Sequence, residues 1–133
     1  MSLFRPQLWR IPTTGEAERR QLPELTATLE TRLKHIARRY PQAVFASSLA
    51  VEDMIITDAI CRLKLPLRII TLDTGKLNPE TAALITAVNV RYQTELEVFH
   101  PDPESARQFE QEFGATAMYD GVALRRRCCH IRK

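Results

Sequence analysis

Two adjacent cysteines lie in a dense run of basic residues, Arg125 to Lys133. The Cα atoms of Cys128 and Cys129 are only about 3.8 Å apart across a trans peptide, whereas a relaxed disulfide spans about 4.4–6.8 Å. A disulfide between them would therefore be strained. Two thiolates on one metal centre need no such bond, and cysteine thiolates hold iron–sulfur clusters. The pair thus suggests half of a metal site. The alternative for Arg125, Arg126 and Arg127 is that they form a solvated basic face.

Two further residues, Lys133 and Cys61, are candidates because of their positions relative to the cysteine pair. Lys133 follows Cys129 by four residues, so in a helix both side chains share one face and an ammonium lies near the thiolates. The third cysteine, Cys61, lies far upstream in an apolar segment and is predicted to be a buried helical residue. Because a cubane cluster needs four thiolates, the predicted site is incomplete within this sequence.

A second candidate site follows the apolar run at residues 43–48, where a strand leads into a helix predicted over residues 52–62. Backbone N–H groups and the positive helix end then face the carboxyl edge of a sheet, where α/β proteins bind anions. The hydroxyls of Ser47 and Ser48 can add donors to a phosphate or sulfate. The alternative is that Ser48 only caps the helix and the acidic residues after it complement the helix dipole. The candidate residues are Ser47, Ser48, Leu49, Ala50, Val51, Glu52 and Asp53.

A third set of candidates follows the next apolar strand at the same predicted edge. Gly75 permits a tight turn, Leu72 or Leu77 could lie against a base, and Asp73 could orient a ligand or the neighbouring loop. Taken alone, Asp-Thr-Gly is an ordinary turn. Two such loops at one edge predict a nucleotide pocket. The candidates in this loop are Leu72, Asp73, Thr74, Gly75 and Lys76.

The elements that position these loops follow from apolar periodicity. Apolar residues three and four apart predict helices over residues 24–39, 52–62 and 104–113, and Asn78 and Pro79 can begin another. Short apolar runs predict strands over 43–48, 67–72 and 94–99. Strands separated by helices indicate the α/β class, with a parallel sheet and flanking helices. The sequence predicts an extended arm over residues 1–23 and one nucleotide-binding domain over 24–133.

Composition narrows the functional classes. A chain of 133 residues with 44% hydrophobic and 26% charged residues is typical of one globular domain. The net charge of +3 is concentrated near the cysteine pair, which favours a pocket for a small anion over a nucleic-acid surface. No apolar stretch approaches the roughly 18 residues of a membrane span. Three cysteines without framework spacing argue against a secreted disulfide scaffold. We therefore expect a cytoplasmic protein with no membrane or nucleic-acid partner, and homo-oligomerisation stays open.

Taken together and in this order, the segments 47–53, 72–77 and 125–133 resemble those of assimilatory adenylylsulfate reductases. The resemblance extends over roughly residues 25–133. Phosphoadenylylsulfate reductases share the first two motifs, whereas the Cys-Cys pair marks the cluster-bearing adenylylsulfate branch. The resemblance implies a fold like that of the adenine nucleotide alpha-hydrolases, with a phosphate loop at the first segment and an adenosine loop at the second.

The resemblance also implies roles at the third segment. Cys128 and Cys129 would be two of the four ligands of a 4Fe-4S cluster, and Lys133 would be a catalytic residue between the cluster and the substrate sulfate. The implied reaction is thioredoxin-dependent reduction of adenosine 5'-phosphosulfate to sulfite and AMP, in the assimilation of sulfate toward cysteine.

The family pattern continues beyond what this sequence contains. A second Cys-x-x-Cys pair and a Glu-Cys-Gly segment bearing the nucleophile do not occur among the 133 residues. The resemblance therefore implies the amino-terminal, nucleotide-binding portion of a longer oxidoreductase, and we expect these residues alone to bind substrate without turnover. Two alternatives are a non-catalytic adenine-nucleotide-binding module and a phosphoadenylylsulfate reductase.

Overall fold

The computed structural model describes residues 12–133, in which helices alternate with strands. The elements are α1 Glu16–Arg39, β1 Val44–Ser47, α2 Val51–Arg62, β2 Arg68–Leu72, α3 Pro79–Tyr92, β3 Glu97–Phe99, α4 Pro103–Phe113, the 3-10 helix η2 Ala117–Tyr119 and α5 Val122–Arg132. This order confirms the predicted α/β class. Within the described range, none of the helices combines the length and the apolar character required to cross a membrane.

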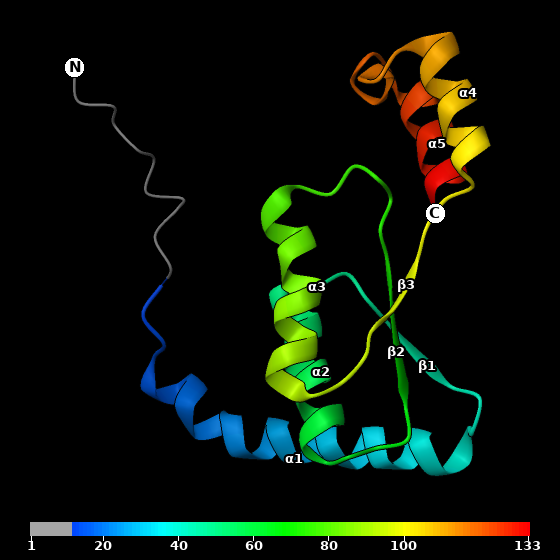
Figure 1. The fold of residues 1–133 in the computed structure, drawn as a ribbon. Helices are drawn as coiled ribbons and strands as arrows, with labels where there is room; N and C mark the ends of the chain where they lie inside the picture. Colours follow the sequence, from blue (N-terminus) through cyan, green and yellow to red (C-terminus); the bar gives the residue numbers. More distant parts are fainter. Residues whose placement is uncertain (1–11) are drawn as a thin grey trace, which may run out of the picture.

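The three strands form a parallel sheet in the order β1-β2-β3. Helices α2 and α3 lie together on one side of the strands, and α1 lies across their amino ends (Figure 1). Ser47 pairs with Thr71 at the carboxyl ends of β1 and β2. Because parallel strands end at the same edge, the two loops predicted to bind a nucleotide begin side by side.

The buried residues form two separate apolar clusters. The larger one joins α1, the sheet, α2 and α3 through residues that include Leu33, Ile60 and Ile69. The smaller one joins α4, η2 and α5 through Phe109, Ala117 and Cys128. In Figure 1, α4 and α5 pair with each other beyond the carboxyl ends of the strands, apart from α2 and α3. We call residues 16–99 the sheet unit and residues 103–133 the helical unit.

Helix caps fix the starts of α3 and α4. The side chain of Asn78 accepts a hydrogen bond from the Thr81 N–H at 2.7 Å, and Pro79 occupies the first turn. This confirms the predicted start of α3. Asp102 caps α4 in the same way, accepting from the Ser105 N–H at 3.0 Å.

The structure corrects the predicted amino-terminal arm. Helix α1 begins at Glu16, with Gly15 as its N-cap, so residues 16–23 are helical; residues 1–11 of the predicted arm lie outside the described residues. Pro23 lies inside the helix rather than before it. An acidic first turn and the ion pair from Arg20 to Glu16, at 2.9 Å, favour the helix. This part of the helix is exposed, so water can bond the carbonyl that Pro23 leaves without a donor.

Candidate functional site

A cavity of about 330 Å³ opens at the carboxyl edge of β1 and β2. This volume falls within the range of about 300–1,000 Å³ that is usual for small-molecule sites. The walls combine aliphatic side chains with several hydroxyls and one ammonium. The lining residues are Ala46, Ser47, Ser48, Leu49, Ile70, Thr71, Leu72, Thr74, Leu77, Thr81 and Lys133.

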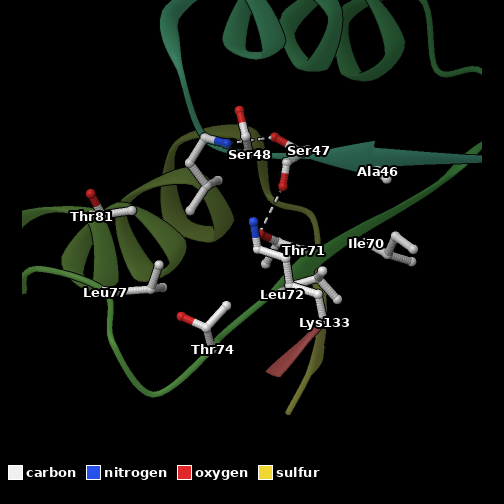
Figure 2. Close-up of a pocket in the computed structure, with 11 residues that line it drawn as sticks. Ala46, Ser47, Ser48, Ile70, Thr71, Leu72, Thr74, Leu77, Thr81 and Lys133 are labelled. Atoms are coloured by element: carbon white, nitrogen blue, oxygen red, sulfur yellow. Dashed lines mark hydrogen bonds between the residues drawn. The ribbon is translucent and has the colours of Figure 1, made fainter. Parts of the chain in front are cut away.

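The cavity brings together residues from all three segments that the sequence singled out. Figure 2 shows Lys133 extending from the end of α5 into the cavity, on the side of Ser47 and Thr71. Leu72 and Leu77, the two residues predicted to lie against a base, both line the wall. Seven residues of the two predicted loops do not line the cavity: Ala50, Val51, Glu52, Asp53, Asp73, Gly75 and Lys76. Cys128 and Cys129 do not line it either.

Sequence reasoning missed two hydroxyls of this cavity. Thr71 lies near the end of β2 and donates a hydrogen bond to the Ser47 carbonyl at 2.8 Å. Thr81 lies in the first turn of α3, directly above the cap at Asn78. A threonine in the first turn of a helix that follows a candidate loop is a signal that could have identified Thr81.

The loop after β1 is closed by its own side chains. Both the N–H and the hydroxyl of Ser48 donate to Asp53 Oδ2, each at 2.6 Å. The hydroxyl bond, followed by the N–H bond, lowers the pKa of the Asp53 carboxyl. The N-cap of α2 is Ala50 rather than Ser48, so the alternative in which Ser48 caps the helix is wrong. Asp53 therefore shapes the loop from outside the cavity.

The same loop turns sharply at Leu49. This residue is 6% exposed and has a φ of 64°, which non-glycine residues adopt rarely. The turn leads into α2, whose N-cap Ala50 makes no side-chain cap bond. The positive end of α2 and the ammonium of Lys133 therefore act on the same region, which suits an anion.

The loop after β2 is shaped by Asp73. Its Oδ1 accepts from the Gly75 N–H at 2.9 Å, and its own N–H donates to the Phe99 carbonyl at 2.8 Å. His100 Nδ1 lies 3.9 Å from Asp73 Oδ2. The Asp73 side chain thus orients its own loop rather than a ligand or the neighbouring loop, while Leu72 and Thr74 line the cavity.

A network of charges connects this loop to the helical unit, and sequence reasoning missed it. Arg132, only 8% exposed, donates from Nη1 to the Thr74 carbonyl at 2.8 Å and from Nη2 to Glu110 Oε1 at 2.6 Å. Lys76 Nζ lies 2.8 Å from the same Glu110 oxygen and donates to the Ala115 carbonyl at 2.9 Å. The bond from Lys76, and then the charges of Lys76 and Arg132, lower the pKa of the Glu110 carboxyl.

The cysteine pair lies on α5 with its two side chains in different surroundings. Cys128 is 5% exposed and packs in the cluster with Phe109 and Ala117, whereas Cys129 is exposed. Among residues 12–133, no three His, Cys, Asp or Glu side chains are grouped so as to hold a metal ion. The described residues therefore do not by themselves provide the four thiolates of a cubane cluster. Successive helical residues also point in different directions, which separates the two thiols.

Cys61 lies on α2 in the sheet unit and is half-buried rather than fully buried, a small correction to the prediction. Burial raises the pKa of its thiol, more than the bond with Thr94 lowers it. A raised pKa keeps the thiol protonated near neutral pH, which makes Cys61 a poor nucleophile.

The chain is similar in sequence to a known family and to several proteins of known name. The profile of the phosphoadenosine phosphosulfate reductase domain matches residues 42–133. A Neisseria meningitidis serogroup A protein named adenosine 5'-phosphosulfate reductase is 43% identical over 134 residues, covering 100% of this chain and 55% of the relative. Proteins of the same name from Burkholderia cepacia and Allochromatium vinosum are 44% and 42% identical, covering 84% and 87% of this chain and 46% and 48% of their own lengths. The chain thus spans about half the length of these curated relatives, and it belongs to the phosphoadenosine phosphosulfate reductase domain family.

Proposed function

We propose that this chain is the nucleotide-binding portion of a thioredoxin-dependent adenosine 5'-phosphosulfate reductase. One observation carries the proposal: the Ser47–Leu49 loop, the loop after β2 and Lys133 line a single cavity. The names of the relatives, at 42–44% identity, support adenosine 5'-phosphosulfate rather than its 3'-phosphorylated form as the substrate.

Each wall of the cavity suits one part of this substrate. The start of α2 and the hydroxyl of Ser47 would receive the 5'-phosphate. The side chains of Leu72 and Leu77 would flank the adenine, and the ammonium of Lys133 would attract the sulfate. Charge-assisted hydrogen bonds from these groups position the anion without any covalent step by this portion.

The chemical step needs a thiolate that this portion does not supply. In the proposed reaction a cysteine thiolate attacks the sulfur of the substrate, the bond from sulfur to the phosphate oxygen breaks, and AMP leaves with the electron pair. A thioredoxin thiolate then attacks the cysteine sulfur of the resulting S-sulfocysteine, so that sulfite leaves and a mixed disulfide forms. The second thiol of thioredoxin attacks this mixed disulfide, which frees the enzyme cysteine and leaves thioredoxin oxidised to its own disulfide. We assign the nucleophile to the part of the relatives that this chain does not match. Cys61 is unsuited to the role because it is half-buried and its raised pKa keeps the thiol protonated.

Cys128 and Cys129 are proposed to supply two of the four thiolates of a 4Fe-4S cluster in the complete protein. The remaining two thiolates must come from residues other than those of this chain, since Cys61 lies in the sheet unit on α2. The basic residues around the pair would offset the negative charge of such a cluster.

Calorimetric titration with AMP tests the site. A charged hydrogen bond typically contributes about 1.5–3 kcal/mol, so the double substitution Ser47→Ala and Ser48→Ala should weaken AMP binding at least tenfold. Thr86→Ala, on the exposed part of α3, is the control and should bind like the wild type. Equal affinity in the wild type and the double variant would rule out this phosphate site.

Sulfite release separates the reductase from a non-catalytic nucleotide-binding module. The 133-residue chain should bind AMP but release no sulfite, whereas the chain extended by the carboxyl-terminal half of a relative should release it with thioredoxin. Sustained sulfite production by the short chain that disappears in Cys61→Ser would contradict the assignment of the nucleophile. An extended protein that binds AMP but never releases sulfite would favour the non-catalytic module.

A further inference from the structure

Arg132 is a buried cation placed between two units of the fold. It bonds the backbone of the loop after β2 through Thr74 and the side chain of Glu110 on α4. Its third nitrogen, Nε, is buried and finds no partner among residues 12–133. A buried guanidinium that is satisfied on two sides by two different units is held in one orientation by both of them. Because Arg132 and Glu110 both belong to the helical unit, movement of that unit relative to the sheet unit would break the bond from Arg132 to the Thr74 carbonyl.

The loop is shaped to receive this side chain. Gly75 has a φ of +74°, and a Cβ at this position would lie 3.2 Å from Arg132 Nη1. Both the backbone angle and the missing side chain therefore allow the guanidinium to reach the Thr74 carbonyl. This observation is independent of the ion pair with Glu110, and it indicates that the loop and Arg132 fit each other.

The same residues border the cavity. Thr74 lines it, and Lys133, the neighbour of Arg132, extends into it. Lys76, which follows Gly75, bonds Glu110 and the Ala115 carbonyl, so the loop has a second attachment to the helical unit. We call the position in which Arg132 bonds the Thr74 carbonyl the docked position of α5. A nucleotide that orders the loop after β2 must therefore also favour this docked position.

We propose that Arg132 and Glu110 form a latch that couples nucleotide binding in the cavity to the docking of α5. The proposal rests on the proposed nucleotide site, and both residues are positioning residues that act through Thr74 and Lys133. Coupling between two sites is reciprocal: if AMP stabilises the docked helix by some factor, docking of the helix strengthens AMP binding by the same factor. The latch would thereby favour the docked position of Lys133 and the cysteine-bearing helix more strongly when the nucleotide is bound.

Hydrogen exchange of α5, followed by mass spectrometry with and without saturating AMP, tests the latch in the 133-residue chain. Coupling energies usually correspond to about 5–150-fold, so AMP should slow exchange of the α5 peptide at least fivefold in the wild type. In Arg132→Lys, which keeps the charge but loses the planar fork, the slowing should fall below about twofold. The Kd for AMP should rise by the same factor by which the AMP-dependent slowing of exchange decreases.

Glu110→Gln is the second variant. It is chosen because it does not change Arg132, the loop after β2 or any residue that lines the cavity. It should lose the AMP-dependent slowing as Arg132→Lys does. Arg126→Lys on α5 and Glu112→Gln on α4 are matched controls, since both side chains are exposed, and they should behave like the wild type. A merely structural role would raise α5 exchange equally with and without AMP.

Three outcomes would overturn the latch. The first is AMP binding to the wild type with no change in α5 exchange. The second is an AMP effect that is unchanged in Glu110→Gln, and the third is a rise in Kd much larger than the lost slowing. A wild type that does not bind AMP in calorimetry would instead contradict the proposed function, so the two failures are distinguishable.

Discussion

The sheet unit and the helical unit are stabilised differently. The sheet unit surrounds a parallel sheet with helices and buries a large apolar cluster that includes Leu33, Ile60 and Ile69. The helical unit has three buried residues in its cluster. Among residues 12–133, the hydrogen bonds and ion pairs between the units run from Arg132 to Thr74 and from Lys76 to Glu110 and Ala115. The comparison suggests that apolar burial forms each unit, whereas charge determines how the cysteine-bearing helix meets the cavity.

The largest expected effect comes from opening the core of the sheet unit. Ile60 is 2% exposed, and replacing a buried isoleucine by alanine usually costs about 2–5 kcal/mol. Ile60→Ala should therefore lower the free energy of unfolding by that amount and reduce AMP binding wherever the unfolded fraction becomes large. Urea unfolding followed by circular dichroism measures the change. Ile55→Ala, at a residue that is 58% exposed, should stay within about 0.5 kcal/mol of the wild type.

A smaller effect is expected at the cap of α3, which belongs to the same unit. Asn78→Ala removes the acceptor for the Thr81 N–H and should cost about 0.5–2 kcal/mol in the same urea experiment. Asn78→Asp keeps an acceptor at this position and should recover most of the loss. If alanine and aspartate behave alike, the cap does not stabilise the sheet unit.

The smallest effect is expected at acidic pH, where the helical unit and the sheet unit should respond differently. The pKa values of Asp102 and Glu110 are lowered, chiefly by bonds from Ser105 and Lys76 respectively. Because these folded values lie below the unfolded ones of about 3.9 and 4.3, both contributions are complete above pH 5 and are lost as the pH falls through the folded values. Arg132 also donates a hydrogen bond to Glu110, and the backbone N–H of Glu104 also donates to Asp102.

Between pH 6 and pH 3, amide exchange in α4 and α5, corrected for its intrinsic pH dependence, should therefore rise before exchange in α3 rises. The cap of α3 is the Asn78 amide, which does not titrate in this range. Asp53 also has a lowered pKa, so the loop after β1 should loosen in acid without fraying α3. Simultaneous loss of protection in all three helices would contradict the difference between the units.

Most of the sheet unit could be predicted from the sequence because its signals are local. Apolar runs mark β1 and β2, and the Asn78 and Pro79 pair marks the start of α3. The start of α1 could not be predicted in this way, since Pro23 reads as a helix breaker but is tolerated in an exposed helix. Local signals are therefore reliable where a cap or a buried strand is involved and unreliable where solvent compensates for a lost bond.

The helical unit depends more on contacts between distant parts of the chain, which are harder to predict from sequence. Arg125, Arg126 and Arg127 are exposed, as the alternative of a solvated basic face expects. Arg132 is buried because its partners, Thr74 and Glu110, come from distant parts of the chain. The burial of Cys128 does have a local signal, because Leu124, Cys128 and Ile131 recur at four and three residues, and Leu124 and Ile131 pack against the small cluster that contains Cys128. No local pattern predicts that Lys133 lies near Ser47, because this depends on where α5 packs relative to the sheet unit.

The distance along the chain between Thr74 and Arg132, 58 residues, also sets an order of events during synthesis. At about 5–20 residues per second, the ribosome adds Arg132 roughly 3–12 s after the glycine turn that receives it has been made. The loop after β2 is therefore synthesised before Arg132 and must stay accessible until α5 emerges. A nascent chain that closed this loop on other contacts would have to reopen it for Arg132.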